Sequence, residues 1–387
     1  MNRNNLLTLL LLCVAYICNA QPVTVYRSGT EGYKNFRIPV IVGLPDGKLL
    51  AFAEGRVHNA GDFGDINIVM KTSTDNGKSW SPLQVVVDND TLQAGNAAPV
   101  MDLTDPQYPK GRLFLFYNTG NNHEGEVRKG KGLREVWYIT STDAGKTWSS
   151  PVNITTQVHR PLQPQVNAAY NFPEDWRSYA NTPGHGLQFS RGKYRGRIYI
   201  AANHSAGAPQ PHFTDYIAHG YYTDDHGKTF HLSDNIPVPG SNESTAAELA
   251  DGRLMFNTRN QRGDKKMRIV ALSNDGGATW ASTTFDERLP DPVCEGSLLN
   301  IGWKKNAAIL AFSNCADTMQ RNHLTIRISN ENAGAWPVTI PVAATDNTKG
   351  DFTAYSDLVL LKNKQLGILY EKNGYTEIVF DAYKIKP

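Results

Sequence analysis

One short motif recurs along this chain at a nearly constant spacing, and this repeat restricts the possible folds more than any other feature. We call it the Asp box; it has the form Ser/Thr-x-Asp-x-Gly-x-Thr-Trp. Its copies begin at Ser73, Ser141, Thr223 and Ser273, with a degenerate fifth copy at Ser329. Ser73 and Ser329 are 256 residues apart over four intervals, which gives a period of 64. Self-similarity at a fixed period indicates that the chain repeats one unit of supersecondary structure.

A second repeat, a polar turn followed by a short apolar strand, gives the same period. Its first and last copies are centred on Leu49 and Leu366, 317 residues apart over five intervals, or about 63 residues per repeat. The turn residues are rich in Gly, Asp and Asn, which is typical of strand connections. The copies occupy residues 46–52, 110–116, 195–201, 251–257, 306–312 and 363–369.

The two repeats predict an all-β protein, a six-bladed β-propeller with four antiparallel strands per blade. No stretch of the chain has apolar residues at sustained helical spacing. Residues 21–387 comprise 367 residues, and division by a period of 64 leaves room for six repeats and little else. We therefore expect one propeller domain over residues 21–387. Closure of such a ring removes free sheet edges and leaves a central mouth where loops from every blade meet.

The chemistry of the Asp box is that of a stapled turn. Its Asp can accept hydrogen bonds from turn N–H groups, its Gly allows a positive φ, and its aromatic ring can pack beneath the hairpin. A calcium loop would need an acidic residue at position twelve, where the first copy has Val86. We predict that the Asp boxes are structural, and we expect no metal ion or cofactor.

The N-terminus has the pattern of an export signal. Arg3 precedes an apolar run from Leu6 to Ile17, which is too short to span a membrane, and small residues precede Gln21. We predict that residues 1–20 are a signal peptide and that the mature chain is exported to the periplasm or secreted; the alternative is a buried N-terminal helix. Export leaves Cys294 and Cys315, which could pair in an oxidising compartment or remain two buried thiols.

The overall charge excludes one class of function. Lys and Arg total 39 against 37 for Asp and Glu, a formal charge of +2. Long-range attraction to nucleic acid needs a strongly basic surface, so we expect no nucleic-acid partner. Stable insertion into a membrane is not expected either.

Three arginines lie inside or beside apolar strands. Arg37 lies in Phe-Arg-Ile-Pro before the first strand, Arg259 ends an apolar strand, and Arg327 alternates with two isoleucines. An arginine buried in a strand needs a carboxylate, a phosphate or backbone oxygens as partners. Each could make an internal salt bridge. Alternatively, three arginines from different blades could meet at the axis and hold one planar anion.

The Phe-Arg-Ile-Pro motif together with four well-formed Asp boxes resembles exo-α-sialidases (neuraminidases) of the bacterial and animal lysosomal type. The resemblance extends from about residue 26 to residue 383. It implies that Arg37, Arg259 and Arg327 grip the carboxylate of a sialic acid. It also implies that sialylated glycoproteins, glycolipids or oligosaccharides are the partners of this chain.

The same resemblance implies the catalytic residues. Asp62 matches the family's acid/base, and the alternative is an ordinary loop aspartate. Glu243 matches the base by its spacing to Arg259, which leaves Glu248 as structural support. Tyr355, in Ala-Tyr-Ser-Asp-Leu, matches the tyrosine nucleophile.

Three further residues are implied as substrate contacts. Arg56 matches an arginine near the sugar's 4-hydroxyl, Asp102 matches a partner acid there, and Met101 would line the N-acetyl pocket.

These residues suit one reaction. The anomeric carbon of sialic acid carries a carboxylate that repels a carboxylate nucleophile, and sialidases use a tyrosine instead. A tyrosine has a pKa near 10, so it needs an adjacent base. The expected activity is hydrolysis of terminal sialic acid with retention. The alternatives are a trans-sialidase, a glycosidase for another nine-carbon sugar acid, or a non-catalytic sialic-acid-binding propeller.

Overall fold

The computed structural model describes residues 21–343 and 352–385, and this part of the chain is built almost entirely of strands. The predicted signal peptide lies outside the described residues. The helical elements described are α1 (Glu124–Val127), α2 (Thr155–Val158), η1 (Pro211–Phe213) and η2 (Ala250–Gly252). No helix among the described residues has the length and apolar content needed to cross a membrane.

The strands form five hydrogen-bonded sheets, of which the largest has eight strands in the order β2-β3-β4-β6-β7-β8-β9, with β5 on β4. Its strands are β2 (Asn35–Gly43), β3 (Leu49–Arg56), β4 (Ile66–Ser73), β5 (Gln84–Val87), β6 (Gln93–Asp102), β7 (Arg112–Gly120), β8 (Arg134–Ser141) and β9 (Val152–Asn153).

The other sheets follow in chain order. One contains β10 (Trp176–Asn181), β11 (Leu187–Gln188), β12 (Ile198–Ala206), β13 (Tyr216–Thr223) and β14 (His231–Leu232). The next contains β15 (Ser241–Glu248), β16 (Leu254–Asn260), β17 (Met267–Ser273) and β18 (Ser282–Pro290). Then come β19 (Gly296–Lys304), β20 (Ala307–Cys315), β21 (Leu324–Ser329) and β22 (Val338–Ala343). The last sheet is made of β23 (Ser356–Leu360), β24 (Gln365–Lys372), β25 (Glu377–Lys384) and β1 (Val23–Arg27).

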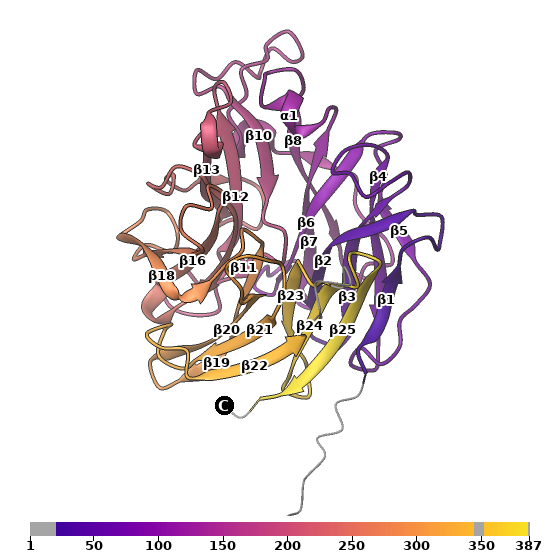
Figure 1. The fold of residues 1–387 in the computed structure, drawn as a ribbon, viewed down its shortest axis with the longest axis vertical. Helices are drawn as coiled ribbons and strands as arrows, with labels where there is room; N and C mark the ends of the chain where they lie inside the picture. The colour runs from indigo at the N-terminus through magenta and orange to yellow at the C-terminus, as the bar shows by residue number, and fades with distance from the viewer. Residues whose placement is uncertain (1–20, 344–351, 386–387) are drawn as a thin grey trace, which may run out of the picture.

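These sheets succeed one another around a ring, so the prediction of an all-β propeller is confirmed (Figure 1). The sheet count, however, is five rather than six. The eight-stranded sheet is continuous because β4 and β6 share one parallel pair, Ile66 with Gln93. All other pairings in that sheet are antiparallel and join strands that are close in sequence.

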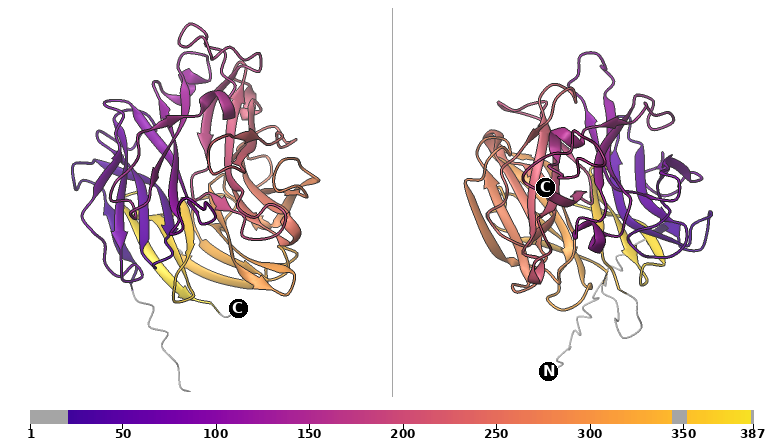
Figure 2. Two further views of the ribbon diagram at one scale, coloured as in Figure 1. Left: turned by 180° about the vertical axis from the view of Figure 1, so that it is seen from behind. Right: turned by 90° about the horizontal axis from the view of Figure 1, so that it is seen from above.

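The ring closes between the two ends of the chain. β1 pairs antiparallel with β25, from Val23 opposite Phe380 to Arg27 opposite Glu377. Both views in Figure 2 show the indigo and yellow strands side by side. The N-terminal strand therefore completes the C-terminal sheet: β1 is its edge strand, and β25 is paired on both sides.

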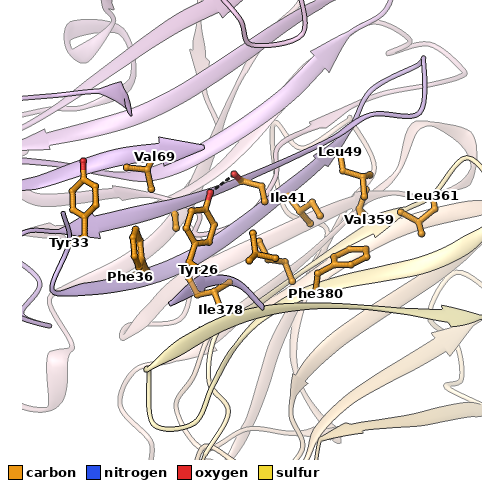
Figure 3. Close-up of a cluster of buried hydrophobic side chains, with 14 residues drawn as sticks. Tyr26, Tyr33, Phe36, Ile41, Leu49, Val69, Val359, Leu361, Ile378 and Phe380 are labelled. Atoms are coloured by element: carbon orange, nitrogen blue, oxygen red, sulfur yellow. Dashed lines mark hydrogen bonds between the residues drawn. The ribbon is translucent and has the colours of Figure 1, made fainter. Parts of the chain in front are cut away.

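Apolar residues at the junction of the first and last sheets hold this closure together. Phe36, Ile41 and Val359 pack in one cluster with Phe380 (Figure 3). Tyr26 in the same cluster is fully buried, and its hydroxyl donates to the Ala51 carbonyl at 2.6 Å. Burial of such side chains stabilises by roughly 1.5–3 kcal/mol each relative to leaving them exposed.

The Asp boxes form the stapled turns that the sequence predicts. In the first, the Ser73 hydroxyl accepts from the Gly77 N–H at 2.9 Å, and Asp75 accepts from the Ser79 N–H at 3.0 Å. The copies beginning at Ser141, Thr223 and Ser273 repeat both bonds. Hydrogen bonds from the side chain and backbone of Ser79 lower the pKa of Asp75 to about 2.

The glycine of the first Asp box also packs against the neighbouring sheet. Gly77 has a φ of +85°, and a Cβ there would lie 2.1 Å from the ring of Phe380. Only glycine fits both constraints, so the box fixes its own turn and the contact between sheets.

Strand register separates the Asp boxes from the other end of each hairpin. In the first hairpin Leu49 lies opposite Ser73, and Arg56 lies opposite Ile66. Leu49 and Arg56 are seven residues apart, which is about 23 Å in an extended strand. Arg56 therefore lies at the end of the hairpin away from the Asp box.

Candidate active site

A cavity of about 350 Å³ lies at the end of the propeller opposite the Asp boxes. Its lining contains six of the nine residues that the sequence analysis selected: Arg37, Arg56, Asp62, Glu243, Arg259 and Tyr355. They come from β2, β3, the loop after β3, β15, β16 and the segment before β23. The ring thus gathers these side chains from three different sheets into one cavity.

Tyr355 and Glu243 are in direct contact in this cavity. The Tyr355 hydroxyl donates to the Glu243 carboxylate at 2.5 Å. Arg259 joins the pair, donating from Nη1 to Glu243 at 2.6 Å and to the Tyr355 oxygen at 3.1 Å. Burial and the negative charge of Glu243 raise the pKa of Tyr355, opposed by Arg259 and Arg321. The phenol is therefore neutral here, and its proton already points at a carboxylate.

Arg259 has a further donor that is not satisfied. Its Nε–H group is buried and has no hydrogen-bond partner among the described residues. Burial would lower the pKa of Arg259, but Glu243 and Tyr355 together outweigh it, and the pKa is raised. A charged guanidinium in a cavity wall is suited to binding an anion.

Arg37 is fixed from behind by a buried carboxylate. Its Nε donates to Glu371 at 2.6 Å, and the Tyr355 backbone N–H donates to the same carboxylate at 3.1 Å. Glu371 also accepts from the Ile38 N–H at 3.0 Å. One side chain in β24 thus sets the position of both Arg37 and the tyrosine segment. Glu371 lies outside the motifs that mark the other site residues, although a buried strand arginine needs such a partner.

Asp62 is the exposed member of the group, and 71% of its side chain is accessible. It accepts from Arg56 Nη1 at 2.7 Å, while Arg56 Nη2 donates to Glu54 at 2.7 Å. Partial desolvation beside the cavity wall tends to raise the pKa of Asp62, but Arg56, with Arg37 and His123, outweighs it and the pKa is lowered. In this state Asp62 is a carboxylate held by Arg56, so donation of a proton requires that contact to change.

The third predicted arginine is not where the sequence analysis expected it. Arg327 lies in β21, where its Nη1 donates to Asn314 at 3.0 Å, and it does not line the cavity. Arg321 lines the cavity instead, with its guanidinium carbon 5.6 Å from the centre of the Tyr355 ring. β21 begins at Leu324 near the cavity and runs away from it, which carries Arg327 about 10 Å along the strand. Arg321 precedes the strand and stays at the cavity.

Asp102 and Met101 are also remote from this cavity. Both end β6, whose other end contributes Gln93 and Asn96 to the lining. Six residues of extended strand separate Asn96 from Asp102, about 20 Å. The Asn96 N–H donates to Glu54 at 3.0 Å, so the cavity end of β6 contacts the partner of Arg56. Asn96, rather than Asp102, is therefore the β6 residue that lies near Arg56 in the cavity.

Met101 lines a second, larger cavity of about 670 Å³ near the propeller axis. Its walls are mainly apolar side chains of inner strands, including Ile41, Val100 and Leu298. None of Asp62, Glu243 and Tyr355 lines it. Glu248, expected to be structural, lines this second cavity and accepts from the Ser190 N–H at 2.8 Å.

One group of side chains in the described residues has the spacing of metal ligands. Atoms of Asp102, Asp105 and His226 lie within 4.8 Å of one another. Their lone pairs are already used, because Asp102 accepts from His226 Nδ1 at 2.8 Å and Asp105 accepts from Arg112 at 3.0 Å. The arginine at 3.0 Å disfavours a cation here, and we read the group as a structural network.

The cavity holds residues that the sequence did not point to. Arg134 lines it, is buried, and makes no ion pair with a carboxylate in the described part of the chain. Glu124 lines it as well and accepts hydrogen bonds from the hydroxyls of Tyr216 and Ser178. Neither belongs to a repeat, so periodicity gave no signal for them.

The two cysteines of the described chain are free. Cys294 and Cys315 are both buried, and they pack with Ile38, Ala354 and Tyr355 behind the cavity.

Comparison with known proteins assigns the chain to a family. A BNR repeat-like domain matches residues 34–368. The exo-alpha-sialidase of Arthroderma benhamiae is 31% identical over 371 residues, which cover 89% of this chain and 80% of that protein. The sialidase of Micromonospora viridifaciens is 31% identical over 362 residues, covering 89% of this chain and 51% of that protein. This chain thus spans about half the length of the Micromonospora protein.

A solved sialidase structure has a similar fold. The structure of the Hadza microbial sialidase Hz136 superposes with a TM-score of 0.76 at 24% identity, covering 94% of this chain and 68% of that one. On the family match and the identity to the Arthroderma enzyme, this chain belongs to the exo-α-sialidase family of BNR-repeat proteins.

Proposed function

We propose that this chain is a retaining exo-α-sialidase that releases terminal sialic acid from sialylated glycans, with Tyr355 as nucleophile. The observation that carries the proposal is the contact of the Tyr355 hydroxyl with Glu243 at 2.5 Å, bridged by Arg259. A neutral phenol hydrogen-bonded to a base is the activated nucleophile that an anionic anomeric centre requires.

In the first step the Tyr355 oxygen bonds to the anomeric carbon as the bond to the leaving oxygen breaks. Glu243 takes the phenol proton, and Asp62 protonates the leaving oxygen. In the second step Asp62 takes a proton from water, which attacks the anomeric carbon and displaces Tyr355. The phenolate then recovers its proton from Glu243, and two inversions give net retention.

The carboxylate of the substrate is bound by Arg37, Arg259 and Arg321. Arg321 replaces Arg327 in this assignment because Arg321 lines the cavity beside Tyr355. Three guanidinium groups around the nucleophile fix the anomeric carbon near its oxygen, and this positioning lowers the barrier.

Arg56 controls the acid. It holds Asp62 as a carboxylate at 2.7 Å in the free chain. A sugar hydroxyl that accepts from Arg56 would weaken this ion pair and raise the pKa of Asp62, so that the acid becomes protonated when substrate is bound.

The test is turnover of a fluorogenic sialoside by the wild-type chain, followed by labelling with a fluorinated sialyl donor. Turnover with a mass increment on Tyr355 supports the proposal. Binding of sialic acid without turnover would support a non-catalytic propeller, and a label on another residue would reject the nucleophile. Added lactose separates hydrolysis from transfer, since a trans-sialidase would yield sialyl-lactose. The remaining alternative is a glycosidase for another nine-carbon sugar acid. A fluorogenic glycoside of such an acid tests it, because that alternative predicts faster turnover of this substrate than of the sialoside.

We also infer that the propeller has six blades. The eight-stranded sheet divides into β2–β5 and β6–β9, each an antiparallel unit, joined only by the pair Ile66 and Gln93. This division agrees with the 64-residue period. Export after cleavage of residues 1–20 remains a proposal, and N-terminal sequencing of secreted material would test it.

A further inference from the structure

The cavity has a buried end and an open end. Arg37 and Arg259 are 9% exposed and Tyr355 is 6% exposed. Two other residues of the lining are open to solvent: the Asp62 side chain is 71% exposed, and Phe213 is 40% exposed. Among the large exposed apolar side chains of the described chain, only Phe213 lines this cavity.

This gradient in depth sets the direction of a bound sialoside. Its carboxylate is held by arginines at the buried end, and its glycosidic oxygen must reach Asp62. The sugar that carries the sialic acid therefore extends past Asp62 toward solvent, and Phe213 is the large exposed apolar side chain of this lining.

Phe213 is held in a strained turn. It ends η1, between β12 and β13, and has a φ of +57°, while His212 before it has a φ of +54°. Left-handed backbone is uncommon for residues other than glycine and costs of the order of 1–3 kcal/mol per residue. Two such residues in succession persist only where surrounding contacts fix them.

The contacts that fix this turn come from Arg128 and Asp215. The guanidinium of Arg128 lies 5.0 Å from the centre of the Phe213 ring and 5.1 Å from that of Tyr216. Arg128 is itself held by two bonds to the buried carboxylate of Asp215, at 3.0 and 2.7 Å. Asp215 also accepts from the Gln210 N–H at 3.1 Å, which ties down the start of the same turn.

We propose that Phe213 is a specificity-determining platform for the leaving sugar, a hexopyranose whose apolar C–H face stacks on the ring. This inference rests on the proposed sialidase function. A rigid aromatic ring offers a large apolar surface at low entropic cost, and a pyranose has an apolar face to cover it. The Asp215–Arg128 clamp holds the ring in place before substrate arrives.

The experiment compares two substrates that share the sialic acid and differ in the leaving group: sialyl-lactose and methyl α-sialoside. For Phe213→Ala we expect KM for sialyl-lactose to rise about 3- to 10-fold, the range for one aromatic contact. KM for methyl α-sialoside and kcat for both should stay within about 2-fold. Phe213→Trp should retain wild-type KM, and Phe213→Leu, which keeps apolar bulk without a ring, should resemble Phe213→Ala.

Leu103→Ala is the matched control, because Leu103 is 58% exposed and does not line this cavity. Equal KM increases for both substrates would mean that Phe213 contacts the sialic acid itself and would overturn the inference, as would unchanged KM for sialyl-lactose in both Phe213→Ala and Phe213→Leu. If the wild-type chain is active on both substrates and the Phe213 variants have unchanged KM, only the platform is rejected and the sialidase function stands. A wild-type chain inactive on both would reject the sialidase function and the platform with it.

Discussion

The two ends of this propeller are built on opposite principles. At the Asp-box end the same two hydrogen bonds recur in four turns, and each joins residues four apart in sequence. At the cavity end no arrangement is repeated, and several partners are remote in sequence: Arg37 and Glu371 are 334 residues apart. Arg259 and Tyr355 are 96 apart.

This difference shows how one fold can keep a rigid frame and still vary its chemistry. The Asp-box side chains satisfy one another locally, so each turn is stable wherever the repeat occurs. Several cavity side chains, such as Arg37 and Tyr355, find their partners only when the ring is closed, and the buried Nε of Arg259 has no partner among the described residues. Changes at the cavity end should therefore affect activity, and changes at the Asp-box end should affect stability.

The largest expected effect is at the nucleophile. Tyr355→Phe should lower kcat on sialyl-lactose by about 10³-fold or more, because the residues of a covalent mechanism act as a unit. The melting temperature should change little, since the ring remains in place. Activity assays and calorimetry on the same preparation check both statements. Loss of activity together with a large fall in melting temperature would contradict the separation of the two ends.

The acid should show a large effect that depends on the leaving group. Asp62→Asn should lower kcat/KM on sialyl-lactose by roughly 10²-fold or more. Aryl sialosides, whose leaving groups need little protonation, should lose much less. Equal losses on both substrates would remove Asp62 from the acid role.

The pH profile tests the control of Asp62 by Arg56. Arg56 favours the carboxylate and lowers the pKa of Asp62, so Arg56→Met should raise that pKa. An acid with a higher pKa stays protonated to higher pH, and the alkaline limb of kcat/KM should move upward. If the alkaline limb of the kcat/KM profile does not move, a group other than Asp62 sets that limb.

The two arginines of the 321–327 segment provide a matched pair. Arg321→Ala should weaken binding of free sialic acid by about 10- to 100-fold, the range for one lost charge-assisted hydrogen bond. Arg327→Ala should change it less than about 2-fold, because Arg327 bonds Asn314 outside the cavity. Calorimetric titration of both variants decides the assignment, and the reverse order would restore Arg327.

The smallest effect is expected at the Asp-box end. Asp75→Asn should lower the melting temperature by about 1–2 °C, as expected for the loss of roughly 1 kcal/mol in a chain of this length, and leave kcat unchanged. The pKa of Asp75 is lowered to about 2, so its contribution is fully present above the unfolded pKa near 4. The difference between wild type and variant should shrink as pH falls from 4 toward 2. A constant difference over this range would contradict a carboxylate role.

Most of the fold was predictable because its signals are local and periodic. The Asp box near Ser73 and the turn before Leu49 each occupy fewer than ten residues, and their repetition gave the period. The sheet count could not be predicted, because the contact of Ile66 with Gln93 depends on how two neighbouring units meet in space.

The grouping of residues in one cavity was predictable where a short motif lies close to that cavity. Arg37, Asp62, Glu243 and Tyr355 were chosen from short motifs, and the structure brings them together. The expectation that Asp102 and Arg327 line this cavity does not match the structure, for one reason. Each is separated from the cavity by several residues of strand. A resemblance between motifs does not say at which end of a strand a residue lies.

By itself the sequence determined the repeating unit and the turn chemistry, since both follow from bonds within about eight residues. It also supplied the types of residue available for catalysis. Only the tertiary structure decided which side chains share the cavity. That choice depends on strand direction and ring closure: Glu371 in β24 reaches Arg37 in β2 because the last sheet lies beside the first. Such contacts link residues more than 300 positions apart, and no local pattern encodes them.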